Sequence, residues 1–453
     1  MHARALLLPA LLAPALAALT GCPAGAADVR PPDDGFYFPT GLAMSPDEQF
    51  LFVSNANSDL RFGSSSLQVI DLDVVDQLVR GWVDDVQVPS GCTQDLDQRQ
   101  TVICPEEHED DNSRYLLADA SVRMGNFVGE VVLQELMDGR YRLFVPARGD
   151  PSINWIDFDP ADGLLECGGS GSYPRCDSRH QLTALRNDPD LRKLTEEPFG
   201  MYVDSGNGYV IVTHLTTGNI TLTDSPPDAS DDPLLVDVKG GFFAQSTATG
   251  LRGAVAAAGR EPGNPLDLVY VTSRAEARVQ MIHVEQPEGA YPLIVPTDYF
   301  FLNAVFPAQE SRGLAFSADG NRAHVINRRP PALITVDTAL DATGRPRNEV
   351  LQATELCPQA GLVTVADLGE GDRAYVSCFR DGQVCVIDPE AATIESVINV
   401  GRGPHVMAIA KSRKLMYVTN FLENTIAVID LTPGAPSEHR VVVRLGEPDF
   451  GDE

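Results

Sequence analysis

One unit recurs along this chain of 453 residues and constrains its fold more than any other feature. In its clearest copy, Leu415–Asn420 (LMYVTN) and Thr425–Asp430 (TIAVID) are separated by a polar turn of four residues. Short runs rich in β-branched and aromatic residues on either side of a polar turn predict a β-hairpin. We take Asn420 as the first anchor of this hairpin and Asp430, ten residues later, as the second.

The same pair of anchors recurs upstream. The spacing of ten residues returns in five copies, Ala147/Asp157, His214/Asp224, Ser273/His283, Asn327/Asp337 and Cys378/Asp388. In the first copy, Asn55/Asp71, the spacing is 16 residues. A further apolar run precedes each hairpin and another usually follows it, which gives four short strands per repeat. Seven repeats of four strands predict an all-β fold, a seven-bladed β-propeller of four-stranded antiparallel blades over residues 36–446.

The ends of the repeat array bear on how the ring closes. The first repeat opens with its inner strand, Thr40–Met44, and the last ends with its own outer strand, Arg440–Leu445, so no strand is left over for a shared closing blade. We expect closure either by packing between the first and last blades or by Gly35–Phe38 adding an edge strand.

The sequence Tyr417-Val418-Thr419-Asn420 matches the signature of YVTN-type propeller repeats, and the chain resembles lactonase-like propellers of this type, least clearly between residues 72 and 140. This resemblance implies either hydrolysis of sugar lactones by residues at the channel mouth or redox chemistry linked to haem or quinone. The chain has no GxSxG elbow, no paired base and nucleophile at a shared spacing and no cluster of its eight histidines. We therefore favour a binding or scaffold protein over an enzyme and predict no cofactor.

The aligned repeats suggest where binding would occur. At the entry to most inner strands the sequence has a glycine, which permits close approach of another backbone or a ligand. The residues immediately before this glycine position are, in repeat order, Thr40, Met124, Phe199, Arg252, Arg312, Ala360 and His405. The loop after the second strand opens on the same face and adds Arg148, Arg274 and Arg328, with His214 at an anchor. Because a guanidinium group binds both oxygens of a carboxylate or phosphate, these residues predict a mouth that binds an anion or a partner protein. The alternative is that the arginines pair with neighbouring acids and hold the blades together.

The overall charge contrasts with this basic face. The chain carries 34 Lys and Arg against 64 Asp and Glu, a net charge of −30. Such an acidic chain is not expected to bind nucleic acid or to dock on anionic lipid by charge. Six of the acids are anchors that end a strand before a turn, where a carboxylate accepts backbone N–H bonds, and we interpret them as structural: Asp71, Asp157, Asp224, Asp337, Asp388 and Asp430.

The N-terminus predicts export. Residues 1–21 have the charged start, apolar stretch and small residues of a signal peptide, and Leu19-Thr20-Gly21-Cys22 resembles the bacterial lipobox, which implies lipidation of Cys22. An ordinary secretory peptide with a chance cysteine remains the alternative. We expect a flexible tether over residues 22–35, an acidic tail over 447–453 and, because Pro23 rather than Asp follows the cysteine, an outer-membrane or surface location. A membrane held through the lipid and another envelope protein or an anionic ligand are the expected partners.

Seven cysteines remain after Cys22, and their placement predicts disulfides rather than metal binding. Cys92 and Cys104 flank one short loop and Cys167 and Cys176 another, while Cys357 and Cys378 are expected on one face of the ring. Such pairs are typical of an oxidising compartment, whereas a zinc site needs CxxC or Cys/His spacing that is absent here. Cys385 is then left as a free buried thiol.

Overall fold

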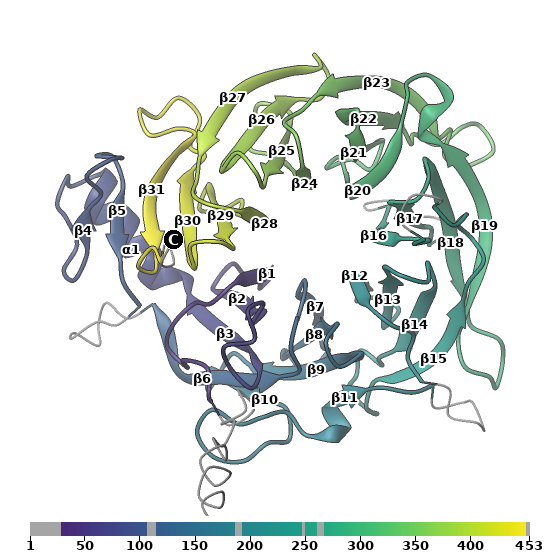
Figure 1. Cartoon of the computed structure of the whole chain (residues 1–453), viewed down its shortest axis with the longest axis horizontal. Coiled ribbons are helices and arrows are strands. Elements are labelled where there is room, and N and C mark those ends of the chain that lie inside the picture. Colours follow the sequence, from purple (N-terminus) through teal and green to yellow (C-terminus); the bar gives the residue numbers. More distant parts are fainter. Residues whose placement is uncertain (1–28, 107–114, 186–192, 247–249, 261–266, 450–453) are drawn as a thin grey trace, which may run out of the picture.

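The computed structural model describes residues 29–106, 115–185, 193–246, 250–260 and 267–449. Seven β-sheets follow one another around a common axis and form a closed ring (Figure 1). The predicted fold, an all-β propeller of seven four-stranded blades, is confirmed. The predicted signal peptide, Cys22 and the last residues of the acidic tail lie outside the described residues.

Each blade runs from an inner strand at the axis to an outer strand at the rim. The strands of blades 1 to 3 are β1 (Pro39–Met44), β2 (Phe50–Asn55), β3 (Ser65–Asp71) and β6 (Leu116–Met124); β7 (Val132–Glu135), β8 (Tyr141–Ala147), β9 (Ser152–Asp159) and β10 (Leu164–Glu166), with β11 (Gln181–Leu182) also paired to β9; and β12 (Pro198–Asp204), β13 (Tyr209–His214), β14 (Ile220–Asp224) and β15 (Leu234–Lys239).

The remaining blades repeat this plan. The strands of blades 4 to 7 are β16 (Ala254–Gly259), β17 (Val269–Ser273), β18 (Arg278–Glu285) and β19 (Leu293–Phe301); β20 (Gln309–Phe316), β21 (Arg322–Arg329), β22 (Pro331–Asp337) and β23 (Glu349–Glu355); β24 (Ala360–Asp367), β25 (Asp372–Cys378), β26 (Gln383–Asp388) and β27 (Thr393–Asn399); and β28 (Pro404–Ala410), β29 (Leu415–Asn420), β30 (Thr425–Asp430) and β31 (Arg440–Leu445). The second and third strands of every blade are the hairpin that the anchors predicted.

The anchors and the glycines before them have structural roles. Asn55 and Asn327 each accept, through Oδ1, a backbone N–H from the segment that enters their blade, Tyr37 (3.2 Å) and Gln309 (2.9 Å). Gly200 allows neighbouring blades to meet, because a Cβ there would lie 2.0 Å from the carbonyl oxygen of Val255 in the next blade. The inner strands therefore approach one another more closely than larger residues would permit.

Most of the acidic anchors accept backbone N–H bonds after the end of their strand, as predicted. Asp71, Asp388 and Asp430 accept backbone N–H bonds from the turns that follow them, and Asp337 does so while also pairing with two arginines. Asp157 differs, since its carboxylate is held by both ends of the buried Arg142 guanidinium (2.7 and 3.0 Å).

The ring closes through a segment that the sequence did not reveal. β5 (Val102–Cys104), from the long insertion in the first repeat, pairs in parallel with β31 of blade 7, and β4 (Thr93–Gln94) pairs with β5. The first and last blades also pack together, as one of the two expectations had it. The other was wrong: Gly35–Phe38 forms no strand. Phe38 has a φ of +50°, which breaks an extended segment, and its N–H instead donates to Oδ1 of Asn424 in blade 7 (2.8 Å).

The same insertion provides α1 (Leu72–Val83), which the sequence analysis did not predict. Asp71 caps the helix by accepting the N–H groups of Asp73 and Val74. Apolar side chains on one side of the helix, Leu72, Val75, Leu78 and Val79, are buried against blade 7. The described helices include none that is long and apolar enough to cross a membrane.

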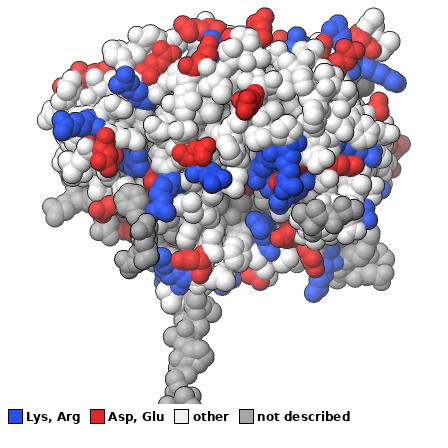
Figure 2. Space-filling model, turned by 45° about the horizontal axis from the view of Figure 1, so that its top comes forward, with Lys and Arg blue, Asp and Glu red and all other residues white. Residues whose placement is uncertain are grey.

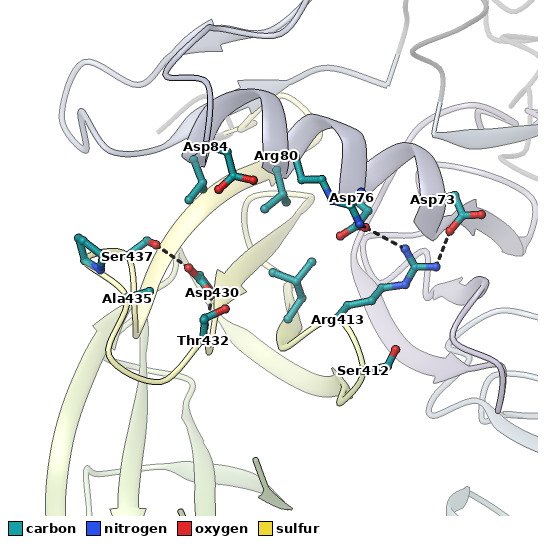
Figure 3. A pocket seen from close by; sticks show the side chains of 14 residues that line it. Asp73, Asp76, Arg80, Asp84, Ser412, Arg413, Asp430, Thr432, Ala435 and Ser437 are labelled. Carbon is teal, nitrogen blue, oxygen red and sulfur yellow. Dashed lines mark hydrogen bonds and ion pairs between the residues drawn. The ribbon is translucent and has the colours of Figure 1, made fainter. Parts of the chain in front are cut away.

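Arg413 joins blade 7 to the first repeat at the edge of a groove of about 690 Å³ beneath α1 (Figure 3). Its Nε and Nη1 donate to the carbonyl oxygens of Glu48 (3.0 Å) and Leu72 (3.1 Å). Its Nη2 lies 2.5 Å from Asp73, and Nη1 lies 3.4 Å from Asp76. One mostly buried side chain thus satisfies two carbonyls and two carboxylates across the closure.

We expect Arg413→Ala to lower the free energy of unfolding by about 2–3 kcal/mol, because several charge-assisted bonds are lost and buried acceptors are left unpaired. Arg80→Ala is the matched control: Arg80 lies across the same groove and also contacts Asp76, but its side chain is 69% exposed. Its loss should cost about 0.5 kcal/mol or less. Urea unfolding of both variants measures the difference, and equal midpoints would contradict the role given to Arg413.

Three disulfides join the pairs named from the sequence, Cys92–Cys104, Cys167–Cys176 and Cys357–Cys378. Cys385 is a buried free thiol whose Sγ lies 3.4 Å from that of Cys378. Structural disulfides at this density are typical of proteins that fold outside the cytoplasm.

Candidate functional site

The residues at the channel mouth follow from strand register. In each blade one residue of the entry to the inner strand pairs with the first anchor, and we call the next residue the mouth position of that blade. These mouth positions are Thr40, Gly129, Phe199, Val255, Arg312, Gly361 and His405.

In four repeats the residue named from the sequence occupies the mouth position, and in three another residue does. Met124 ends the outer strand of blade 1, Ala360 is the residue that pairs with the anchor Cys378, and Arg252 precedes β16 by two residues. In the second and fourth repeats, insertions shift the alignment, so that Met124 and Arg252 precede the mouth positions Gly129 and Val255 by several residues.

Arginines gather on one side of the mouth, between blades 4 and 5. Four guanidinium groups surround the single carboxylate of Glu310, at 2.9 Å from Arg329, 3.2 Å from Arg312, 3.9 Å from Arg274 and 4.0 Å from Arg328. Burial together with the neighbouring Arg328 and Arg274 lowers the pKa of Arg312 to about 9. One carboxylate does not balance four cations, so this cluster carries excess positive charge in an acidic protein.

The predicted basic residues are only partly brought together. Arg148 lies across the mouth, 3.6 Å from Glu197 and with its guanidinium over the ring of Phe199. Arg252 does not join the mouth residues, and it donates to the carbonyl oxygen of Phe243 within an insertion. His214 is fully buried, with its ring nitrogens bonded to Glu196 O (3.1 Å) and Thr221 Oγ1 (2.7 Å). Burial lowers its pKa to about 4, so His214 is an uncharged part of blade 3.

A cavity of about 270 Å³ opens at the mouth. Phenylalanines from several blades line it: Phe127, Phe199, Phe379 and Phe421. Arg148, His405 and Glu130 add polar groups. The Nδ1 of His405 lies 3.1 Å from the carbonyl oxygen of Thr40, and burial, with Arg328, Arg312 and Arg148 nearby, lowers its pKa. The cavity therefore combines an aromatic wall, the guanidinium of Arg148 and an uncharged imidazole, and the arginines around Glu310 lie outside its lining.

Glu130 provides a carboxyl group to the mouth cavity and is not among the residues predicted from the sequence. It follows the mouth position Gly129. The residues that follow the mouth positions of the other repeats are Gly41, Gly200, Ala256, Gly313, Leu362 and Val406. It lines both the mouth cavity and a deeper cavity of about 200 Å³ between the inner strands. Burial raises its pKa to about 7, although the backbone N–H of Met201 bonds to it. The run Val131-Val132-Leu133 marks the true inner strand of the second repeat and could have revealed Glu130.

One group of metal-ligating side chains lies close together among the described residues, the sulfurs of Cys357, Cys378 and Cys385. Two of them form a disulfide, which removes the thiolates that a metal would need. These cysteines therefore do not provide a metal centre in the oxidised protein.

On the side of the molecule that Figure 2 shows, acidic and basic residues are interspersed, without a broad area of one sign.

Several solved structures have a similar fold. A periplasmic gluconolactonase of Pseudomonas aeruginosa is 16% identical, with a TM-score of 0.51 over 79% of this chain and 84% of that one. A Bacteroides uniformis protein provisionally assigned as a 6-phosphogluconolactonase is 12% identical, with a TM-score of 0.51 over 79% and 83%. Hydrazine synthase of Kuenenia stuttgartiensis is 12% identical, with a TM-score of 0.54 over 89% and 98%.

The likeness is one of fold. No family model matches the chain, and no curated protein matches its sequence. At these identities the neighbours place the chain among seven-bladed propellers that include lactonases, and the site's own residues must decide what it binds.

Proposed function

We propose that this propeller is an exported envelope protein whose channel mouth binds a small molecule bearing a carboxylate or phosphate. The cluster of four guanidinium groups around Glu310 carries the proposal. Two further atoms support it, since the Nε atoms of Arg312 and Arg148 are buried without a hydrogen-bond partner among the described residues. Buried donors of this kind are normally satisfied, and a bound anion would satisfy them.

The cavity restricts the size and shape of the ligand. Its volume of about 270 Å³ suits a molecule of monosaccharide size rather than a protein loop, and the phenylalanines offer flat apolar surfaces for the faces of a ring. A sugar acid has both features. This geometry favours a small ligand over a scaffold role through the same face.

Isothermal titration calorimetry with gluconate, glucuronate and 6-phosphogluconate tests the proposal, with glucose as the uncharged comparison. We expect saturable binding of at least one acid that glucose does not displace in a competition titration, and binding that weakens as the salt concentration rises. Displacement of the acid by an equal concentration of glucose, or no binding of any acid, would overturn it.

A second candidate, lactone hydrolysis, rests on Glu130. A carboxyl group with a pKa of about 7 beside a mouth cavity can act as a general base at neutral pH. The Glu130 carboxylate would take a proton from water as that water attacks the lactone carbonyl carbon, while the guanidinium of Arg148, which lines the same cavity, stabilises the oxyanion. As the ring ester C–O bond breaks, the protonated Glu130 returns the proton to the ring oxygen, which gives a hydroxy acid, an anion that the arginines would hold. Release of acid from gluconolactone above the spontaneous rate measures this activity, and its absence would remove the candidate.

The proposed location follows from the N-terminus and the disulfides. We propose that Cys22 carries lipid and that the protein stays attached to the envelope through it. Palmitate labelling that is lost in Cys22→Ala would support this, and labelling that persists in the variant would contradict it.

A further inference from the structure

Blade 5 lacks an apolar cross-strand pair that the other six blades have on their second and third strands. Three residues before the first anchor, every other blade has a large apolar or aromatic side chain: Phe52, Phe144, Ile211, Tyr270, Tyr375 and Tyr417. The residue opposite on the third strand is also apolar: Val69, Trp155, Leu222, Met281, Val386 and Val428. All twelve are buried. In blade 5 the same cross-strand pair is His324 and Thr335.

In the other blades this pair forms the apolar contact with the next blade. Tyr270 and Met281 of blade 4, for example, pack in one cluster with Val325 and Ile334 of blade 5. His324 and Thr335 belong to no apolar cluster; instead they line a cavity of about 620 Å³ between blades 5 and 6. The cavity is bordered by the β20–β21 and β24–β25 turns, which lie at the opposite end of the strands from the mouth.

The imidazole of His324 is only half satisfied. Its Nδ1 lies 3.2 Å from Thr335 Oγ1, while its Nε2 has no hydrogen-bond partner among the described residues. The residue is 1% exposed. A buried polar atom without a partner costs about 1–3 kcal/mol, and phenylalanine or isoleucine, the residues at this position in blades 1 to 3, would avoid that cost. The pair is therefore better explained by a ligand than by stability.

Charges around the cavity restrict the ligand. Burial and the nearby Arg322 lower the pKa of His324 to about 4, so the inner end of the cavity disfavours a positive charge. Three arginines line the cavity, and each has an acidic partner: Arg322 and Arg347 pair with Asp337, and Arg373 pairs with Glu395. Carboxylates predominate at the rim: Asp319, Glu370, Asp372, Asp388 and Glu390. They repel an anion but accept hydrogen bonds from hydroxyl groups.

We propose that the cavity between blades 5 and 6 is a second binding site, and that it takes a neutral polyhydroxylated molecule, a sugar or polyol. Hydroxyl groups both donate and accept, so they match an unprotonated imidazole, a threonine hydroxyl, carboxylates and the amide of Gln352, which also lines the cavity. The volume lies within the range of small-molecule sites. The site is independent of the mouth and does not rest on the function proposed there.

Calorimetry on the full chain with glucose, maltose and myo-inositol tests the site, with spermidine and gluconate as charged comparisons. His324→Phe/Thr335→Val restores the residue types of the other blades and should weaken binding of the neutral probe at least tenfold. Thr335→Val alone should weaken it as well. Thr221→Val is the matched control, because it removes the hydroxyl from another buried His–Thr pair, with His214, which does not line this cavity.

The double variant should remain folded, with an unchanged or higher melting temperature, and should retain any binding of sugar acids at the mouth. The proposal is overturned if no neutral probe binds saturably, if His324→Phe/Thr335→Val binds it within twofold of the unmodified chain, or if spermidine binds more tightly than every neutral probe. Loss of binding in Thr221→Val to the same extent would also overturn it, since the effect would then not be local.

Discussion

Arg312→Ala should weaken binding of a sugar acid at the mouth by about tenfold to a hundredfold. Arg312 occupies a mouth position, and the Nε of its guanidinium is buried without a partner among the described residues. A hydrogen bond to a charged group contributes about 1.5–3 kcal/mol, which corresponds to that range of affinity. Calorimetry with gluconate measures the change, and binding of glucose should be unaffected.

Two variants around the same carboxylate separate ligand binding from general charge. Arg329 also pairs with Glu310, but its side chain is 68% exposed, so Arg329→Ala should change the affinity by no more than about twofold. Glu310→Gln removes the one acid that the arginines share and should tighten binding. If Arg312→Ala and Arg329→Ala weaken binding equally, the effect is long-range charge and the mouth is not the site.

The anchors made the fold predictable from the sequence, because their constant spacing reflects a hairpin whose ends bond to fixed partners. Asn55 and Asn327 accept the N–H of the segment that enters their blade, and Asp71, Asp388 and Asp430 hold the turns that follow. These contacts are local, and they recur because each blade must fix the two ends of its central hairpin.

Closure could not be predicted in the same way, because it depends on residues far apart in the chain. β5 pairs with β31 across some 340 residues, and the three-residue strand Val102–Cys104 has no pattern of its own. The mouth residues of the second and fourth repeats were misplaced for a related reason, since a glycine near an insertion marks a turn as readily as a close approach. This misplacement hid Glu130, whose position at the mouth follows directly from strand register.

The sequence did contain the exception in blade 5. Aligning the repeats on their anchors puts His324 among aromatic and aliphatic residues and Thr335 among apolar ones. What the alignment does not contain is the cavity beside them, which the turns of blades 5 and 6 create.

Glu130→Gln should make the protein more stable at alkaline pH and leave it unchanged in acid. The pKa of Glu130 is about 7 in the folded protein against an ordinary value of 4.5, so the folded state holds this proton more tightly than the unfolded state. Stability contributed by the protonated carboxyl is therefore complete below about pH 4.5 and is lost as the pH rises towards 7. At pH 8 the loss amounts to about 3 kcal/mol, which the uncharged amide of glutamine avoids.

Urea unfolding of both proteins at several pH values between 4 and 8 measures this difference. Glu135→Gln is the control, because Glu135 ends the same inner strand but is exposed, and it should change stability by no more than about 0.5 kcal/mol at any pH. A pH-independent difference between Glu130→Gln and the unmodified chain would show that the carboxyl is not held protonated by burial.

The same variant decides between the two functions of the mouth. If Glu130 is the base for lactone hydrolysis, Glu130→Gln should lower the rate by at least about a hundredfold, because glutamine cannot accept the proton from water. It should still bind gluconate, since the guanidinium groups around Glu310 are untouched. Loss of hydrolysis with retained binding identifies an enzyme, whereas retained binding in a chain that hydrolyses no lactone identifies a binding protein whose channel acid serves only to tune its stability with pH.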